Sequence, residues 1–324
     1  MAAYQALMDE LRGGGIAVLD GATGTELQRR GAAMDAASWC APATLVHDRL
    51  LQEIHADYIR AGARIVTANT FSASPLMLRP SGFAERSFEN IQRAVGAARS
   101  ARDRTPGGKD VVLAGSLSHM VPVAQGTAVV EPGKMPAPAE ISDSFHAVAT
   151  GLKAAGCELI LLEMMYEPTR VRLALEAALA TGLPIWFGMS ARRGTDGRAV
   201  SFHHFDELPI SSVAQLIPLD RVDVAGVMHS GAEIVQPALD ELRQSFHGPL
   251  MAYPDSGYFE MPDWRFVDII TPERFEQFCL QWLRSGVQLI GGCCGLGVAH
   301  IEAASRARDV VLAGRRSVTR AAPA

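Results

Sequence analysis

Short apolar runs rich in β-branched residues recur along the chain, and longer stretches with apolar positions three to four residues apart separate them. A run of four to eight such residues, bounded by glycine or polar positions, is typical of a strand that is buried on both faces. The pattern predicts strands at 16–20, 64–69, 111–115, 158–163, 184–190, 222–228, 249–254 and 287–292.

The stretches between these runs have the spacing of amphipathic helices. The helix predicted at 45–63 follows Thr44, a suitable N-cap, and the helix at 142–156 ends at Gly156, which suits the left-handed position after a helix. Further helices are predicted at 1–15, 168–180, 231–246, 271–285 and 298–313. The repeated alternation predicts an α/β fold, a (β/α)8 TIM barrel in a single domain. We assign the barrel to 1–312 and a flexible basic C-terminal tail to 313–324.

Composition narrows the class of protein. The 324 residues are 48% hydrophobic and 20% charged with a formal net charge of −5, so neither nucleic acid nor an anionic membrane is an expected partner. No apolar run has the roughly 18 residues that predict a membrane-spanning helix, and the N-terminus lacks the basic start and long apolar core of a signal peptide. Five cysteines, an odd number, fit a reducing compartment, so we expect a cytoplasmic protein.

Polar residues gather at the ends of the predicted strands. In a parallel barrel, the carboxyl ends of the strands meet at one face, where active sites lie. In chain order these ends carry Asp20, TANTF at 67–71, GSLSH at 115–119, Glu163, Ser190, His229, YPDSG at 253–257, and Cys293 with Cys294. The sequence therefore predicts a site at this face of the barrel.

Two adjacent cysteines lie in LIGGCCGLG at 289–297. Neighbouring thiols rarely bridge each other, because the ring that they close is strained. Packing of small side chains beside a glycine-rich turn is one interpretation, and a redox pair is another, although redox pairs favour CxxC spacing. The third is a Zn²⁺ site in which both thiolates bind one ion and a fourth position stays open for substrate. His229 is the expected third ligand, and His119 or a histidine of FHH at 202–204 is the alternative.

Four motifs, DGATGTELQRRG, AGARIVTANTF, YPDSG and GGCCG, occur in this order between about residues 15 and 310. Together they resemble the homocysteine S-methyltransferase family, which includes enzymes that use betaine or S-methylmethionine as methyl donor. The resemblance implies a zinc-dependent (β/α)8 barrel, in agreement with the strand pattern. It also implies that Cys293 and Cys294 are zinc ligands.

The same resemblance implies roles for the substrate-binding residues. Asp20 and Glu163 would hold the amino group of the thiol acceptor, and backbone near Gly21 and Thr70 would help to bind its carboxylate. Trp39, in SWCA, stands where relatives have an aromatic wall of the methyl-donor pocket. The face of a Trp ring attracts a sulfonium or quaternary ammonium group by cation–π interaction. A core aromatic is the alternative role for Trp39.

Three segments depart from the family pattern. GVMH at 226–229 stands where GxNC is usual, so His229 replaces a cysteine; SLSHM at 116–120 replaces S-x-GP-x-G, and YPDSG replaces YPNSG. We expect the first change to affect the metal and the others to affect the pocket. Three thiolates on Zn²⁺ sum to −1, whereas two thiolates and a neutral imidazole sum to zero. A neutral site should hold an incoming thiolate more tightly and leave it a weaker nucleophile.

These observations predict a zinc-dependent enzyme that moves a methyl group from a small cationic donor to a thiol acceptor, with homocysteine expected as acceptor. No segment resembles a cobalamin-binding DxHxxG motif or a folate-binding domain, so we expect the donor to be a small free molecule. Two alternatives stay open. One is a zinc enzyme of the same barrel with another acceptor, another donor or a hydrolytic role, and the other is a non-catalytic metal-binding protein. The sequence leaves the oligomeric state open, a homo-oligomer included.

Overall fold

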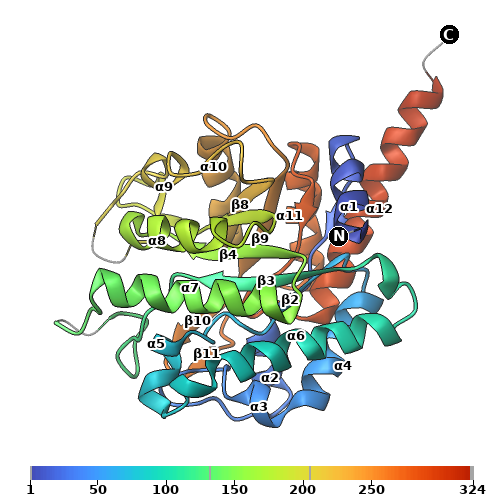
Figure 1. The fold of residues 1–324 in the computed structure, drawn as a ribbon. Helices are drawn as coiled ribbons and strands as arrows, with labels where there is room; N and C mark the ends of the chain where they lie inside the picture. Colours follow the sequence, from blue (N-terminus) through green and yellow to red (C-terminus); the bar gives the residue numbers. More distant parts are fainter. Residues whose placement is uncertain (1, 131–132, 204–205, 322–324) are drawn as a thin grey trace.

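The computed structural model describes residues 2–130, 133–203 and 206–321. Its central strands are β1 (Ala17–Val18), β2 (Ile65–Ala68), β3 (Val112–Ser118), β4 (Leu159–Met165), β5 (Ile185–Met189), β8 (Val224–Gly231), β9 (Leu250–Asp255) and β12 (Leu289–Ile290). They form one parallel sheet in the order β1-β12-β9-β8-β5-β4-β3-β2. Strands β2, β3, β4, β8 and β9 of this sheet are labelled in Figure 1. A parallel bridge between Leu19 and Ile65 joins the two ends of this order. The predicted barrel and its strands are therefore confirmed.

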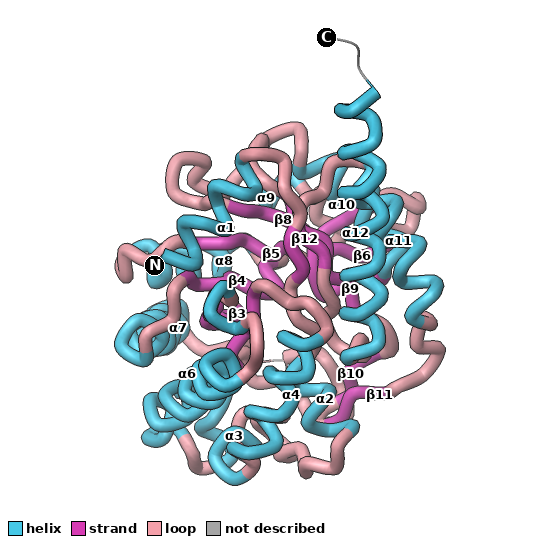
Figure 2. Tube along the Cα trace, turned by 90° about the vertical axis from the view of Figure 1, so that its right-hand side faces the viewer, coloured by secondary structure: helices cyan, strands magenta, loops and turns pink. Residues whose placement is uncertain are grey.

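Helices surround the barrel (Figure 2). They are α1 (Ala2–Arg12), α2 (Thr23–Arg29), α3 (Ala43–Val46), α4 (Asp48–Arg60), α5 (Pro75–Leu78), α6 (Ser87–Arg104), α7 (Pro138–Ala155), α8 (Pro168–Leu179), α9 (Ser211–Ala214), α10 (Ala232–Leu242), α11 (Pro272–Arg284) and α12 (Val298–Ala321), with short 3-10 turns at Arg79–Ser81, Ala84–Arg86 and Gly108–Asp110. The sequence pattern did not predict α6. Between β5 and β8 the chain forms a hairpin, β6 (Ala191–Arg193) and β7 (Ala199–Ser201), and the short α9 in place of a long helix.

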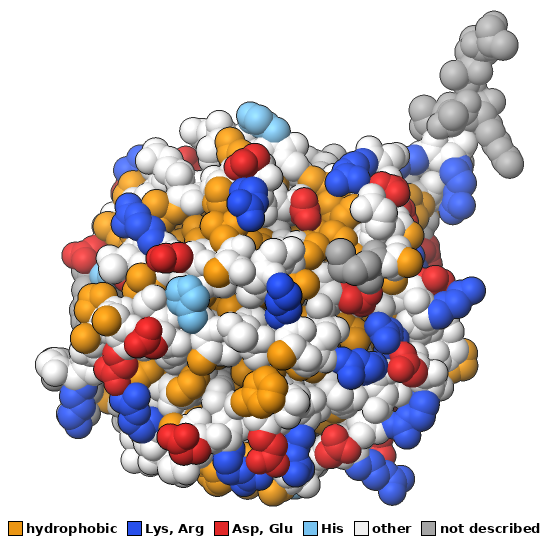
Figure 3. All heavy atoms as spheres, in the orientation of Figure 1, with side chains coloured by type: hydrophobic (Ala, Val, Ile, Leu, Met, Phe, Trp, Pro, Cys, Tyr) orange, Lys and Arg blue, Asp and Glu red, His pale blue; other side chains and the backbone are white. Residues whose placement is uncertain are grey.

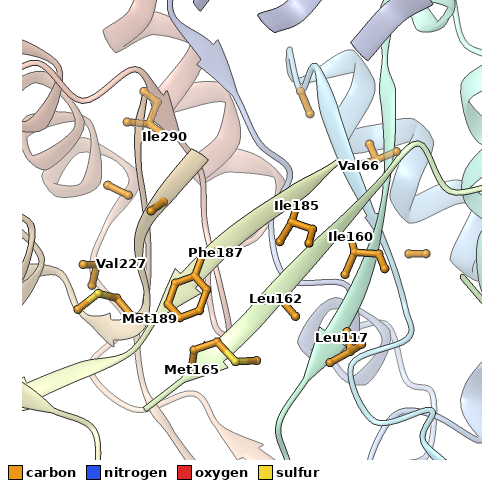
Figure 4. Packing of buried hydrophobic residues seen from close by; sticks show 14 of the residues in the cluster. Val66, Leu117, Ile160, Leu162, Met165, Ile185, Phe187, Met189, Val227 and Ile290 are labelled. Carbon is orange, nitrogen blue, oxygen red and sulfur yellow. The ribbon is translucent and has the colours of Figure 1, made fainter. Parts of the chain in front are cut away.

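Side chains alternate between the inside and the outside of the barrel along each strand. In β4, Leu159 and Leu161 pack inside, whereas Ile160 and Leu162 pack outside against the helices. Figure 4 shows this outer layer, in which Ile160 and Leu162 lie near residues of β5. Burying each such side chain contributes about 1.5–3 kcal/mol. The same alternation turns Glu163 inward at the carboxyl end of β4.

The amino end of the barrel is closed by α1. Its buried side chains Tyr4, Leu7, Met8 and Leu11 pack in one cluster with the inward residues of the strands. The indole Nε1 of Trp186, on β5, donates a hydrogen bond of 3.1 Å to the Tyr4 hydroxyl. Because α1 fills this end, a ligand reaches the barrel interior from the carboxyl end.

The last helix is longer than its sequence pattern predicts. It continues to Ala321 instead of ending at 313, and its final turns stand clear of the barrel (Figure 1). Arg315 Nη1 donates to the Gly14 carbonyl oxygen at 2.6 Å. The segment assigned to a tail is thus helical as far as Ala321, and 322–324 lie outside the described residues. The flexibility of the tail stays a prediction.

Charged side chains of both signs are mixed over the face shown in Figure 3. Within the described ranges, no helix combines the length and the apolar character needed to cross a membrane.

Candidate metal centre and active site

Three predicted metal ligands come together at the carboxyl end of the barrel. The ligand atoms of His229, Cys293 and Cys294 all lie within 4.8 Å of one another. Two thiols and an imidazole form a donor set that Zn²⁺ takes in catalytic sites, where one position stays open for substrate. The residues therefore fit a metal ion, although their binding of one stays a prediction.

Backbone hydrogen bonds hold the cysteine loop between two strand ends. The Cys293 N–H donates to the Pro254 carbonyl oxygen at 2.7 Å, and the Cys294 carbonyl oxygen accepts from the Ser256 N–H at 2.9 Å. The Gly292 N–H donates to the Asp20 carbonyl oxygen at 3.1 Å, next to β1. These bonds fix consecutive cysteines so that both face the barrel mouth.

The loop also depends on Gly295, whose φ is +83°. A Cβ at this position would overlap the Ser256 carbonyl oxygen, whereas a Cβ at Gly14, also with φ +83°, would have nothing within 4 Å. An L-residue in the left-handed region loses about 1–2 kcal/mol. We therefore expect Gly14→Ala to lower the free energy of unfolding by about that amount, and Gly295→Ala to lower it more and to weaken metal binding. Chemical denaturation of both variants, with zinc titration, measures the difference, and equal losses would contradict the steric argument.

The two thiols differ in acidity. The pKa of Cys293 is lowered to about 7, because a hydrogen bond with Cys294 and the nearby His229 together outweigh the opposing effect of burial. The pKa of Cys294 is raised well above its usual range, because it shares the hydrogen bond with Cys293 and because it is buried. A metal ligand must be a thiolate, so Cys293 is the thiol that ionises first.

Asp255 holds His229, and sequence reasoning missed this role. The His229 Nδ1 and Asp255 Oδ2 atoms are 3.0 Å apart. The aspartate of YPDSG thus lines the cavity, as expected, and in addition contacts the candidate metal ligand. The signal was present: the histidine and the aspartate depart from the family pattern at the ends of two successive predicted strands. Burial raises the pKa of Asp255 to about 7.

The alternative third ligands lie elsewhere. His119 is fully buried, and its Nε2 accepts hydrogen bonds from the N–H groups of Tyr166 at 3.1 Å and Glu167 at 3.2 Å. Burial and the nearby Arg170 hold the pKa of His119 well below its usual range, so this ring is neutral. In the FHH segment, the Nδ1 of His203 accepts from the Asp206 N–H at 3.0 Å, and His204 lies outside the described residues.

A cavity of about 430 Å³ opens from the metal ligands. The predicted site residues that line it are Asp20, Gly21, Trp39, Glu163, His229, Cys293 and Cys294. Thr70 is buried beside it: its N–H donates to the Ala68 carbonyl oxygen at 2.7 Å and its hydroxyl donates to the Ser116 carbonyl oxygen at 2.8 Å. The N–H and the hydroxyl of Thr70 therefore both hold the end of β2, and a contact of the backbone near Thr70 with the acceptor carboxylate stays a prediction.

Two carboxylates face this cavity without a cationic partner. Asp20 accepts from the Thr67 N–H at 2.6 Å and from the Thr67 hydroxyl at 3.1 Å, and Glu163 accepts from the Ser116 hydroxyl. Burial raises the pKa of each to about 7, and for Glu163 the charge of Asp20 adds to the shift. In the described part of the chain, no Lys or Arg lines the cavity. Buried carboxylates that have no cationic partner in the protein favour a cationic ligand.

Aromatic rings form another wall. The Trp39 ring lies 5.8 Å from that of Phe71 and 5.4 Å from that of Phe259, which belongs to the hairpin of β10 (Tyr258–Glu260) and β11 (Asp263–Arg265). Trp39 is 6% exposed and lines the cavity, so its ring is both buried and available to a ligand. Its φ is +56°, and Met164 and His229, which also line the cavity, likewise have positive φ. Backbone strain of this kind collects at functional sites.

Comparison with known proteins places the whole barrel in one family. Residues 17–308 match the family model described as homocysteine S-methyltransferase. The chain belongs to this family of enzymes.

Individual relatives agree with this assignment. Homocysteine S-methyltransferase 4 from Zea mays is 28% identical over 91% of this chain and 90% of its own length. Selenocysteine methyltransferase from Astragalus bisulcatus is 27% identical, with 87% of this chain and 89% of that protein covered. A crystal structure of homocysteine methyltransferase MmuM from Escherichia coli, in a metallated form, has a TM-score of 0.71 at 27% identity, and the match covers 94% of this chain and 99% of that chain.

Proposed function

We propose that this protein is a zinc-dependent methyltransferase that moves a methyl group from a small cationic donor to the thiol of homocysteine. One observation carries the proposal. A single cavity joins the His229, Cys293 and Cys294 cluster to two buried carboxylates that lack a cationic partner and to an aromatic wall. Membership of the homocysteine S-methyltransferase family and the metallated relative support it.

The carboxylates position the acceptor. Asp20 and Glu163 lie inside the cavity and would each form a charge-assisted hydrogen bond to the ammonium group of an amino acid. Zinc held by the two cysteines and His229 would lower the pKa of the acceptor thiol, so that its thiolate exists at neutral pH. With the amino group anchored on one side and the sulfur on the other, the acceptor has a fixed orientation.

The aromatic wall receives the donor. Trp39, Phe71 and Phe259 line the cavity, and the face of an aromatic ring attracts a sulfonium or quaternary ammonium group. The thiolate electron pair forms the new carbon–sulfur bond to the methyl carbon, while the bond from that carbon to the donor sulfur or nitrogen breaks and its electrons leave with the neutral product. Opposite charges cancel in this step, so no general base is needed. The residues contribute proximity, alignment and exclusion of water.

A product assay tests the proposal. The purified protein, with its zinc content measured, is incubated with homocysteine and each of S-methylmethionine, glycine betaine, dimethylsulfoniopropionate and S-adenosylmethionine. We expect methionine from at least one donor, in proportion to bound zinc. Selenocysteine is the competing acceptor, because a relative is a selenocysteine methyltransferase. Zinc binding without methyl transfer to either acceptor would overturn the proposal and favour a metal-binding protein.

Glu163→Gln should weaken acceptor binding while zinc stays bound. The substitution keeps the size of the side chain but removes the charge that faces the ammonium group, a loss of roughly 1.5–3 kcal/mol. Titration calorimetry with homocysteine measures the change. Glu158→Gln is the matched control, because Glu158 precedes the amino end of the same strand, where its carboxylate accepts from the Leu113 N–H at 3.0 Å. Equal acceptor affinity in wild type and Glu163→Gln would argue against an amino-acid acceptor.

The pH dependence provides a second check on Glu163. Its pKa is raised to about 7, so its carboxylate form, which attracts ammonium, is present above that pH and lost below it. Acceptor affinity should therefore rise with pH through about 7 in the wild type. The rise should be smaller in Glu163→Gln, where Asp20 is the one of these two acceptor-binding carboxylates that still titrates.

A further inference from the structure

The backbone at His229 adopts the left-handed conformation, which is uncommon for a residue other than glycine. Its φ is +43°, in the left-handed region, and the register between β8 and β9 shifts between Met228 and Gly231. Non-glycine residues adopt such a φ at an energetic cost, so the surrounding structure must hold it. This turn directs the imidazole into the mouth of the barrel, where its ring lies 5.2 Å from that of Phe202 and 6.2 Å from that of Trp264.

Asp255 is the last residue of the neighbouring strand, β9. It pairs with Gly231 in the β8–β9 register, and its Oδ2 lies 3.0 Å from His229 Nδ1. Both side chains are 13% exposed, so water competes little for this contact. A carboxylate has no proton to donate, so its position 3.0 Å from Nδ1 favours the imidazole tautomer with the proton on Nδ1 and the lone pair on Nε2. Nε2 is thereby the nitrogen that is free to bind a metal.

We infer that Asp255 is the positioning residue of the metal centre: it selects the His229 tautomer, holds the ring toward Cys293 and Cys294, and adds the negative charge that a neutral imidazole lacks. This inference rests on the proposed function, because it concerns the same metal site. Two thiolates and an imidazole around a divalent cation sum to zero, and Asp255 in its ionised form brings the local sum to −1. Once this carboxylate is counted, the metal centre is therefore not the electrically neutral site expected from the sequence. The carboxylate also makes the imidazole nitrogen a stronger electron-pair donor to the metal.

Two substitutions separate charge from geometry. Asp255→Asn keeps the shape and an oxygen that can accept from Nδ1, but removes the charge, whereas Asp255→Ala removes both. Loss of a carboxylate partner to a metal-binding histidine lowers metal affinity about 10–100-fold. We expect Asp255→Asn to bind zinc about tenfold more weakly than wild type and Asp255→Ala to bind it nearer a hundredfold more weakly, measured by competition with a chelator. Glu163→Gln, which also removes a buried carboxylate from the cavity, should leave zinc affinity unchanged.

Absorption spectra of the protein loaded with cobalt(II) provide a measurement that a loss of folding stability alone would not change. Absorption bands of the bound ion report the ligand set, and we expect Asp255→Ala to shift them while Glu163→Gln leaves them in place. The single variant His229→Cys places a third thiolate beside Asp255, which then has no N–H partner and repels the thiolate. The double variant His229→Cys with Asp255→Asn removes this repulsion and should bind zinc more tightly than His229→Cys. Wild-type zinc affinity in both Asp255 variants, with unshifted cobalt bands, would overturn the inference and leave the proposed function intact. Failure of the wild type to bind zinc would overturn both, and is seen before any variant is made.

Discussion

Cys293→Ser should lose both zinc and methyl transfer while the barrel stays folded. The side chain faces the cavity and contributes one of the convergent ligand atoms, and its hydroxyl replacement is a far weaker zinc ligand than a thiolate. Structural zinc sites with four protein ligands bind the ion with about 10–16 kcal/mol, which is about 2.5–4 kcal/mol for each ligand. Losing one ligand of that strength lowers zinc affinity by about a hundredfold or more. Metal analysis after dialysis, together with turnover, measures both losses.

Cys157→Ser is the matched control for this experiment. Cys157 is also a buried free cysteine, but it lies just before the amino end of β4 and packs in the layer outside the barrel. Its substitution should retain zinc and turnover, even if the free energy of unfolding falls. If Cys293→Ser keeps full zinc content and full turnover, the assignment of the metal centre is wrong.

The barrel was predictable because its strands are buried on both faces. Such strands appear as continuous apolar runs, and all of the runs selected from the pattern became strands of one sheet. Helix α6 was missed because half of its buried residues are alanine, with Asn90 and Ser87 also buried and Gly96 in its middle. Small side chains give a weak periodic signal in sequence, although they pack well against neighbouring helices.

The site was predictable only to the level of strand ends. That rule brought together Asp20, Glu163, His229 and the cysteine pair, which lie far apart in the chain. It does not say which way a side chain turns after its strand ends, so His119 was an alternative ligand although its Nε2 accepts from backbone N–H groups inside the fold. The contact of Asp255 with His229 needed the register of β8 on β9 and the local shift within it, which no single segment encodes.

His229→Ala should lower zinc affinity by about a hundredfold, because it removes one of the protein ligands and leaves Asp255 without its partner. His119→Ala makes the reciprocal comparison. It should retain zinc but lower the free energy of unfolding by about 1–3 kcal/mol for each N–H group left without an acceptor, because His119 accepts from two backbone donors.

X-ray absorption at the zinc edge of the wild-type protein decides which histidine binds. We expect one imidazole nitrogen and two sulfur atoms from the protein around the ion, and the nitrogen should disappear in His229→Ala and persist in His119→Ala. The reason lies in the two rings themselves: Nε2 of His119 is already occupied by the N–H groups of Tyr166 and Glu167, whereas only Nδ1 of His229 is held by Asp255. A wild-type spectrum without an imidazole nitrogen would show that His229 is not a ligand. The Asp255–His229 pair would then have to act on the substrate and not on the metal.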